Sequence, residues 1–263
     1  MFLVRCEFHA WPFLLIMKKI YLILKILISF LFLSCASASF SINDFESVAV
    51  IGVSGNKNLS EQVDTLYVRS DEEDIDDTNP LSVLVDKFLH KENPELLTAQ
   101  DRVDYAEEYL RRALEELAGL RVSEKASVIN SDEYQNAKKN PLSTLNTWIS
   151  ATDFDKNLYS IGSKKARILM NELGVKSLVA AEFRFNKVFA DSSKVKTNVR
   201  AQVIMEVLVY NEKGRQVAMN TFEATSNESL PVRKFEYDTD ALLEMYPEVI
   251  ETVVNKFIMA YLD

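Results

Sequence analysis

Few side chains in this sequence offer the chemistry of a nucleophile or of a soft metal ligand. No cysteine follows Cys35, and the one histidine after it is His90. A zinc site needs several His or Cys ligands, and a serine hydrolase of the common kind needs a G-x-S-x-G elbow, which the sequence lacks. His90 lies in the polar segment KFLHKEN, which we interpret as a solvent-facing helix. The sequence therefore predicts no catalytic residue, no metal ligand and no cofactor.

Carboxylates are numerous, but their spacing favours solvation over chemistry. Ser70–Asp77, SDEEDIDD, lacks the central glycine and terminal glutamate of an EF-hand loop, so we interpret it as a solvated acidic loop. Gly52 and Gly55 follow a predicted strand without the third glycine and the helix of a dinucleotide-binding turn. The number of carboxylates alone does not exclude a catalytic pair of acids like that of a glycosidase. However, nothing distinguishes any acidic residue from those on the predicted, solvated helix faces. We expect a protein that is not an enzyme.

The N-terminal segment predicts export. Ile20–Ser34 is almost wholly apolar and follows the positively charged Met17-Lys18-Lys19, as in a secretory signal. This run is shorter than the ~20 residues that span a bilayer, so we expect cleavage rather than a retained anchor. Met17 is the expected true start, because Met1–Ile16 has a mixed polarity that does not suit a compact signal. We assign residues 1–34 to the signal peptide.

Two cleavage sites compete around Cys35. Phe32–Cys35, FLSC, resembles a bacterial lipobox, although Phe32 and Leu33 depart from the usual leucine followed by a small residue. Ala36-Ser37-Ala38 fits the A-x-A pattern of ordinary signal peptidase. The first site predicts lipidation of Cys35 and attachment to the membrane through the N-terminal lipid, and the second predicts a soluble periplasmic chain. We expect the first, and the second stays open.

The mature chain is strongly acidic. Residues 1–34 hold four basic residues and one acidic residue of the 30 and 39 in the chain, so removing them leaves a net charge of −12. A surface of this sign repels phosphate backbones, so we expect no nucleic-acid partner. It also argues against electrostatic docking on anionic lipid. Because no disulfide can form after Cys35, the domain must be held by its core.

Apolar periodicity predicts the elements of one α/β (α+β) domain over residues 46–263. A short tether, 35–45, precedes it, and a polar, acidic insertion occupies the region around 56–100. Continuous or alternating apolar residues predict strands at Glu46–Val53, Leu120–Ile129, Ser177–Val188, Thr197–Tyr210 and Arg215–Asn227. Three- and four-residue spacing predicts a helix within Pro80–Leu97 that is broken before Pro94. It also predicts helices at Asp101–Ala118, Ser131–Lys139, Ser163–Leu173 and Asp240–Leu262, with another within Asn140–Asp155. The order predicts a mixed β-sheet with amphipathic helices packed against it.

Several residues are expected to end or cap these elements. Thr98 or Asp101 can cap the second helix at its start, and Gly119 and Gly174 can close two helices at their C-terminal ends. Gly214, in the loop after Tyr210, is placed for the positive φ of a hairpin turn.

Five segments together resemble the CsgG/LpoB-like α/β domain of bacterial envelope lipoproteins. They are FESVAVIGV, DYAEEYLRRALEELAGL leading into RVSEKASVI, SKKARILMNELGVKSLVAAEF, the hairpin VIMEVLVYNEKGRQVAMNTFEAT, and the closing helix. Gly52-Val53-Ser54 replaces that family's proline–phenylalanine, and Asn56–Gln100 is longer than its usual connection. The chain is also similar, more faintly, to the concealed outer-membrane lipoproteins of treponemes. The resemblance implies an outer-membrane-associated, periplasm-facing lipoprotein that binds or assists other envelope components.

Three hypotheses follow for the mature protein. The first is a non-catalytic lipoprotein with an envelope protein as partner; the second is a peripheral protein whose helices 80–92 and 240–262 insert into a leaflet; the third is a soluble periplasmic ligand-binding or hydrolytic domain. We favour the first. Its candidate partner surface is the second face of the 199–225 hairpin, where Ile204, Leu208 and Tyr210 add apolar character. The alternative is that helices cover that face, and the sequence leaves oligomerisation open.

Overall fold

A computed structural model describes residues 41–42, 45–64, 94–137, 147–156, 158–192, 195–234 and 236–262. They belong to one compact unit, Phe40–Asp263. Cys35, His90, the acidic run 70–77 and the predicted helix up to residue 93 lie outside the described residues.

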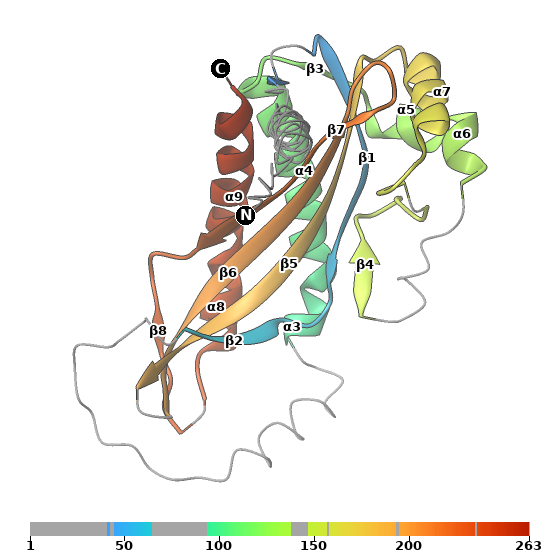
Figure 1. Ribbon diagram of the computed structural model, residues 1–263. Coiled ribbons are helices and arrows are strands. Elements are labelled where there is room, and N and C mark those ends of the chain that lie inside the picture. The colour runs from blue at the N-terminus through green and yellow to red at the C-terminus, as the bar shows by residue number, and fades with distance from the viewer. Residues whose placement is uncertain are drawn as a thin grey trace, which may run out of the picture. The chain divides into compact units, whose positions relative to one another are not determined.

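The core of the fold is a mixed sheet with strand order β3-β1-β5-β6-β7 (Figure 1). β1 runs parallel to β3 and β5, whereas β5, β6 and β7 are antiparallel neighbours. β2 pairs with β5, β4 with β1, and β8 with β6. The strands are β1 Ser47–Asn56, β2 Ser60–Asp64, β3 Arg121–Val122, β4 Trp148–Ser150, β5 Ser177–Ser192, β6 Val195–Tyr210, β7 Gln216–Thr225 and β8 Leu230–Pro231. The predicted α/β class with a mixed sheet is confirmed.

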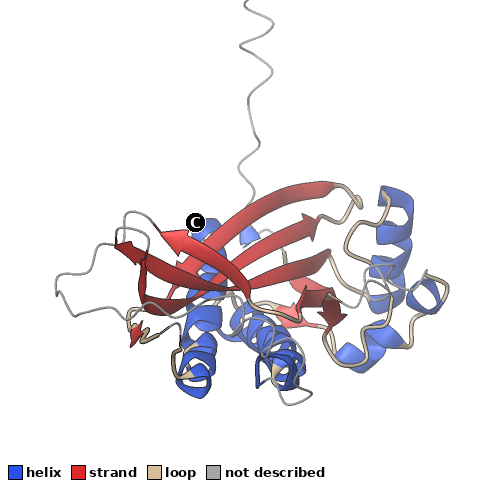
Figure 2. Ribbon diagram, turned by 90° about the horizontal axis from the view of Figure 1, so that it is seen from below, coloured by secondary structure: helices blue, strands red, loops and turns tan. Residues whose placement is uncertain are grey.

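Helices α4 and α9 pack on one side of this sheet, and Figure 2 shows most helices on that side. The helices are α3 Pro94–Leu97, α4 Ala99–Glu116, α5 Lys125–Ile129, α6 Asp132–Gln135, α7 Ser163–Leu173, α8 Thr239–Glu244 and α9 Tyr246–Tyr261. α4 and α9 run parallel, because Tyr105 contacts Glu251 and Tyr109 contacts Asn255 with the same sequence offset. Their apolar stripes complete the core with residues such as Leu110 and Phe257, which are fully buried.

Two glycines have roles that depend on close approach. Gly55 lies inside β1, not in a turn after it, and a Cβ there would lie 2.7 Å from Phe185 Cε2 and 2.9 Å from Val103 Cγ2. The missing side chain therefore lets α4 pack against the sheet. Gly214 has the predicted positive φ, 70°, in the β6–β7 turn, where a Cβ would lie 2.2 Å from the carbonyl oxygen of Ser163.

Other predicted caps have mixed outcomes. Gly174 closes α7 in the left-handed conformation, as predicted. Thr98 is the N-cap of α4, but its hydroxyl donates to the Pro94 carbonyl and makes no capping bond, whereas Asp101 lies within the helix. Gly119 has φ +65° but follows the last helical residue, Glu116, by three positions.

Some predicted elements are wrong where tertiary pairing overrides local spacing. Leu120–Ile129 forms only the two-residue β3 before the chain turns into α5, because the apolar alternation stops at Glu124-Lys125. Trp148 and Ile149 are not helical; they pair with β1 as β4. The closing helix is split into α8 and α9, since Pro247 has no backbone N–H to continue α8.

Two further differences concern the region before α4. Pro94 begins the short helix α3, where the prediction had a helix ending before it. β2 was not predicted, because Ser60–Asp64 has little apolar character and is a strand through its pairing with Asn186–Ala190.

Candidate interaction face of the sheet

Strands β5, β6 and β7 present one side to the helices and a second side that is only partly covered. On β6, Val203, Met205 and Val207 point to the core with no exposed surface, so the residues between them lie on the other side. We call this second side the open face. It consists of Glu182, Arg184, Gln202, Ile204, Glu206, Met219, Thr221 and Glu223.

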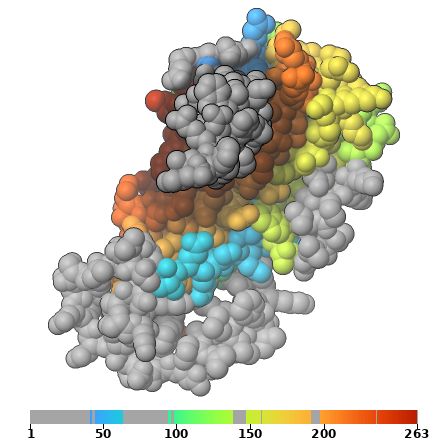
Figure 3. Space-filling view, in the orientation of Figure 1, coloured from blue at the N-terminus to red at the C-terminus, as the bar shows by residue number. Residues whose placement is uncertain are grey.

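The open face is mixed in polarity and accessible over much of its area. Met219 is 56 % exposed, and Arg184, Thr221 and Glu223 are also exposed. Figure 3 shows the orange and brown surface of the last strands beside the yellow residues that precede and form α7. The open face therefore carries isolated apolar groups, Ile204 and Met219, among charged and polar ones.

Two carboxylates face each other on this surface. Glu182 of β5 and Glu206 of β6 are direct cross-strand partners. Partial burial, and then the charge of Glu206, raise the pKa of Glu182, while Arg184 lowers it by a smaller amount. Like charges in directly opposed positions destabilise a sheet. Placing these two carboxylates opposite each other therefore lowers the free energy of unfolding.

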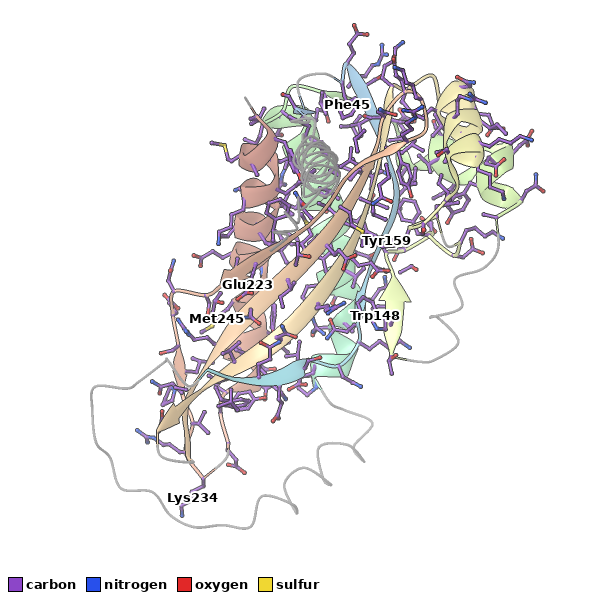
Figure 4. All side chains as sticks on the ribbon, viewed as in Figure 1. Phe45, Trp148, Tyr159, Glu223, Lys234 and Met245 are labelled. Atoms are coloured by element: carbon purple, nitrogen blue, oxygen red, sulfur yellow. The ribbon has the colours of Figure 1, made fainter. Side chains whose placement is uncertain are left out.

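Tyr159 contacts the carboxylate pair from one side. Its hydroxyl donates a 2.8 Å hydrogen bond to Glu206 Oε1 from the loop that precedes α7. Burial, followed by the hydrogen bond and charge of Glu206, raises the pKa of Tyr159 well above its usual range. Because the phenol stays protonated, it is a permanent donor to Glu206. Figure 4 labels Tyr159 at this side of the sheet and Glu223 on β7.

A hydrogen-bonded row continues the open face across three strands. Asn186 Nδ2 donates to Gln202 Oε1 at 2.8 Å, and Gln202 Nε2 donates to Glu223 Oε1 at 2.8 Å. Each amide is fixed by the bond that it makes to its neighbour. The polar groups of this face are thus held in set directions, which reduces the entropy lost when a partner binds.

The open face carries more carboxylates than cationic groups. Within the parts of the chain that the structure describes, no group of three or more His, Cys, Asp or Glu side chains could hold a metal ion. Glu182, Glu206 and Glu223 give the face three carboxylates, against the guanidinium of Arg184. Lys or Arg side chains of a partner would relieve the repulsion between Glu182 and Glu206.

The structure places the three predicted partner-surface residues in different environments. Leu208 is 2 % exposed and Tyr210 is 3 % exposed, so neither is available at the surface as predicted. The Tyr210 hydroxyl donates to the Tyr159 carbonyl at 3.4 Å, because the loop before α7 covers this end of the sheet. Ile204 is partly exposed and belongs to the open face.

A second polar cluster, buried at the other end of β5, has a structural role. Lys187 is 7 % exposed, and its ammonium lies 3.0 Å from Glu95 Oε1, 3.2 Å from the Tyr237 hydroxyl and 3.6 Å from Glu61 Oε1. Burial, and then Glu95, raise the pKa of Tyr237. These contacts join α3, β2 and the segment before α8 to the sheet.

Arg102 of α4 extends this buried cluster. It donates to the carbonyls of Lys57 and Glu95, each at 3.1 Å, and its guanidinium lies over the rings of Phe185 and Tyr246. Burial lowers the pKa of Arg102 from its usual value. The sequence reasoning missed this cluster and the Tyr159–Glu206 contact alike, because both join residues that are far apart in the chain.

The face of the closing helix that was considered for membrane insertion lies in the core. Val249, Ile250, Val253, Val254 and Phe257 are at most 2 % exposed. Packing in the core therefore explains why this helix face is apolar. Among the described residues, no helix combines the length and the apolar character that crossing a membrane requires.

Comparisons with solved structures include two weak likenesses. The chain matches no family model, and no curated protein matches its sequence. It is similar to a lipoprotein, GNA1162, from Neisseria meningitidis, with 9 % identity, a TM-score of 0.33, and coverage of 80 % of this chain and 98 % of that one. It is also similar to the hypothetical protein CT253 from Chlamydia trachomatis, with 11 % identity, a TM-score of 0.28, and coverage of 80 % and 96 %. Likenesses this weak indicate nothing about binding or location, and membership of the CsgG/LpoB-like group stays a prediction.

Proposed function

We propose that this protein is a non-catalytic envelope lipoprotein, anchored through Cys35, that binds a protein partner through the open face of its sheet. The observation that carries the proposal is this face itself. It presents exposed Arg184, Thr221 and Glu223 beside Ile204 and Met219, and hydrogen bonds hold its polar groups in place. The partner that suits it carries Lys or Arg side chains opposite the Glu182–Glu206 pair.

The sequence around Cys35 supports the anchor. A cysteine directly after an apolar export signal, followed by small residues, is where a lipoprotein is cleaved and acylated. Because the mature chain is acidic, electrostatic attraction to anionic lipid would not hold it at a membrane. We therefore assign that role to acyl groups. We place that membrane as the outer membrane, with the domain facing the periplasm, on the resemblance in sequence pattern.

The contacts of the titratable groups support a role without catalysis. Glu182 on the open face and Tyr159 in the loop beside it have raised pKa values. Glu182 lies opposite Glu206, and Tyr159 donates a hydrogen bond to it. The buried Lys187 and Arg102 bind protein groups in a structural cluster. Each of these contacts has a structural explanation.

Intact mass tests the anchor. The protein and a Cys35→Ala variant are expressed in a diderm host. We expect a chain beginning at Cys35 with added acyl groups, and loss of those groups in the variant. An unmodified chain beginning at Ser39 would contradict lipidation and favour the soluble periplasmic alternative.

Site-specific crosslinking tests the open face. A photo-crosslinking residue is placed at Thr221 on the open face or at the exposed Thr252 on α9. We expect one adduct of defined mass from position 221, its loss when Glu182 and Glu206 are both changed to Lys, and none from 252. Equal crosslinking from both positions, or an adduct that persists after charge reversal, would contradict the assignment of this face.

A further inference from the structure

The first described residues lie beside the C-terminal end of α9, the last helix. Ser41 Oγ donates to the carbonyl of Tyr261 at 3.2 Å, and Ile42 and Phe45 are 2 % and 7 % exposed. The first described residues are therefore packed into the domain. Figure 4 shows Phe45 at this end of the domain and Lys234 at the opposite end.

Helices α4 and α9 both terminate at the same end. Their parallel pairing at an offset of 146 residues sets position 113 of α4 level with position 259 of α9. Leu117, four residues beyond that level, is thus only about 6 Å further along the helix axis. Figure 1 shows the C-terminal end of α9 and strand β3 together at this end.

Two of the large apolar side chains that are exposed in the described residues lie there. Met259 is 69 % exposed and Leu117 is 49 % exposed. Met259 is the most exposed of the five; the others, Val63, Ile168 and Met219, are on β2, α7 and β7. Together with the chain entry, Leu117 and Met259 define what we call the anchor end.

The charges of the anchor end do not favour anionic lipid. Glu46, Glu115 and Glu116 are exposed there, and Arg121 and Lys176 are exposed beside the first residues of β1. An excess of Lys and Arg would favour anionic lipid, and these residues show no such excess. The anchor end is therefore better suited to contact through apolar side chains with a leaflet of no net charge.

We propose that the anchor end rests on the lipid leaflet that holds the acylated Cys35, with Met259 and Leu117 in contact with the interface. The inference rests on the proposed lipid anchor. Five residues lie between Cys35 and Ser41, so even a fully extended chain of six steps reaches only about 20 Å. A domain held this closely meets the leaflet with the end from which its chain emerges.

Single-cysteine labelling tests this orientation. In the acylated protein the Cys35 thiol is blocked and no other cysteine follows, so Met259→Cys and Leu117→Cys each take one NBD fluorophore. Val63→Cys, also at an exposed apolar residue but on β2, is the matched control. The purified lipoproteins are placed in vesicles of phosphatidylcholine and phosphatidylethanolamine. We expect blue-shifted emission and at least twofold quenching by nitroxide-labelled lipid at positions 259 and 117, and neither effect at 63.

A second arrangement separates failure of the anchor from failure of the docking. The mature chain with Cys35→Ser and an N-terminal His tag is tethered to the same vesicles containing a small fraction of nickel-chelating lipid. The labels at 259 and 117 should again be quenched more than the label at 63, whether or not Cys35 is acylated in cells. Equal quenching at the three positions in both arrangements would overturn the docking, and absence of acyl mass alone would overturn only the anchor.

Discussion

At Glu182 the fold sets one carboxylate directly opposite another, and the energetic consequence depends on pH. The pKa of Glu182 in the folded state is raised above its ordinary value of 4.5. In the pH range just above that value the folded chain binds more protons than the unfolded chain, so the free energy of unfolding falls as pH rises through this range. At neutral pH the full penalty remains, whereas in acid it disappears.

Glu182→Gln should therefore stabilise the domain at pH 7 and have little effect at pH 4. Urea unfolding at both pH values gives the two differences in the free energy of unfolding. The exposed turn residue Glu212, changed to Gln, is the control and should show no such pH dependence. A stabilisation of equal size at pH 4 and pH 7 would contradict the explanation by burial of the Glu182 charge and by its repulsion from Glu206.

Lys187 illustrates the opposite situation, a buried charge with its partners in place. Lys187→Ala removes the ammonium group that lies 3.0 Å from the buried Glu95 carboxylate, so we expect a loss of about 3–5 kcal/mol in the free energy of unfolding. The control is Lys165→Ala, since Lys165 pairs with Glu133 but its side chain is 56 % exposed; its loss should be no more than ~1 kcal/mol. Equal losses from the two variants in urea unfolding would show that the Lys187 cluster adds nothing beyond a surface ion pair.

Among the elements, the contact between α4 and β1 depends on one missing side chain. Gly55→Ala would place a methyl group against Phe185 and Val103, so we expect a loss of about 1–3 kcal/mol in the free energy of unfolding. Gly52→Ala, in the same strand, meets nothing within 4 Å and should be neutral or slightly stabilising. Thermal and urea unfolding of the two variants provide the measurement, and a Gly55→Ala protein as stable as Gly52→Ala would contradict this account of the packing.

The elements also show which parts of the fold were predictable from sequence. Strands β5–β7 and helices α4 and α7 were found because each carries a long apolar repeat of its own. β2 and β4 were missed, since each is a strand only through its pairing with β5 or β1. The carboxylate pair on the open face depends on the β5–β6 register, and Tyr159 reaches it from a loop, so neither could be read from local spacing.

Over the whole molecule, one continuous apolar core joins the first strand to the last helix, from Ile42 to Ile258. A domain built around one core is expected to unfold cooperatively. Trp148, the one tryptophan after the signal segment, lies on β4 and reports on the pairing of that strand with β1. Its fluorescence should therefore change at the same urea concentration as the far-ultraviolet circular dichroism. An earlier change in fluorescence would mean that β4 separates from the sheet before the rest unfolds.

The parallel pairing of β1 with β5 also governs when the sheet can form. Ser47 and Ser177, which are hydrogen-bonded across these strands, are 130 residues apart in the chain. During synthesis and any export that proceeds from the N-terminus, β1 must wait for its central neighbour until most of the domain has emerged. In an exported chain the β1–β5 part of the sheet would therefore be absent for most of the passage through a membrane. This part of the sheet would form only late, once β5 had also emerged.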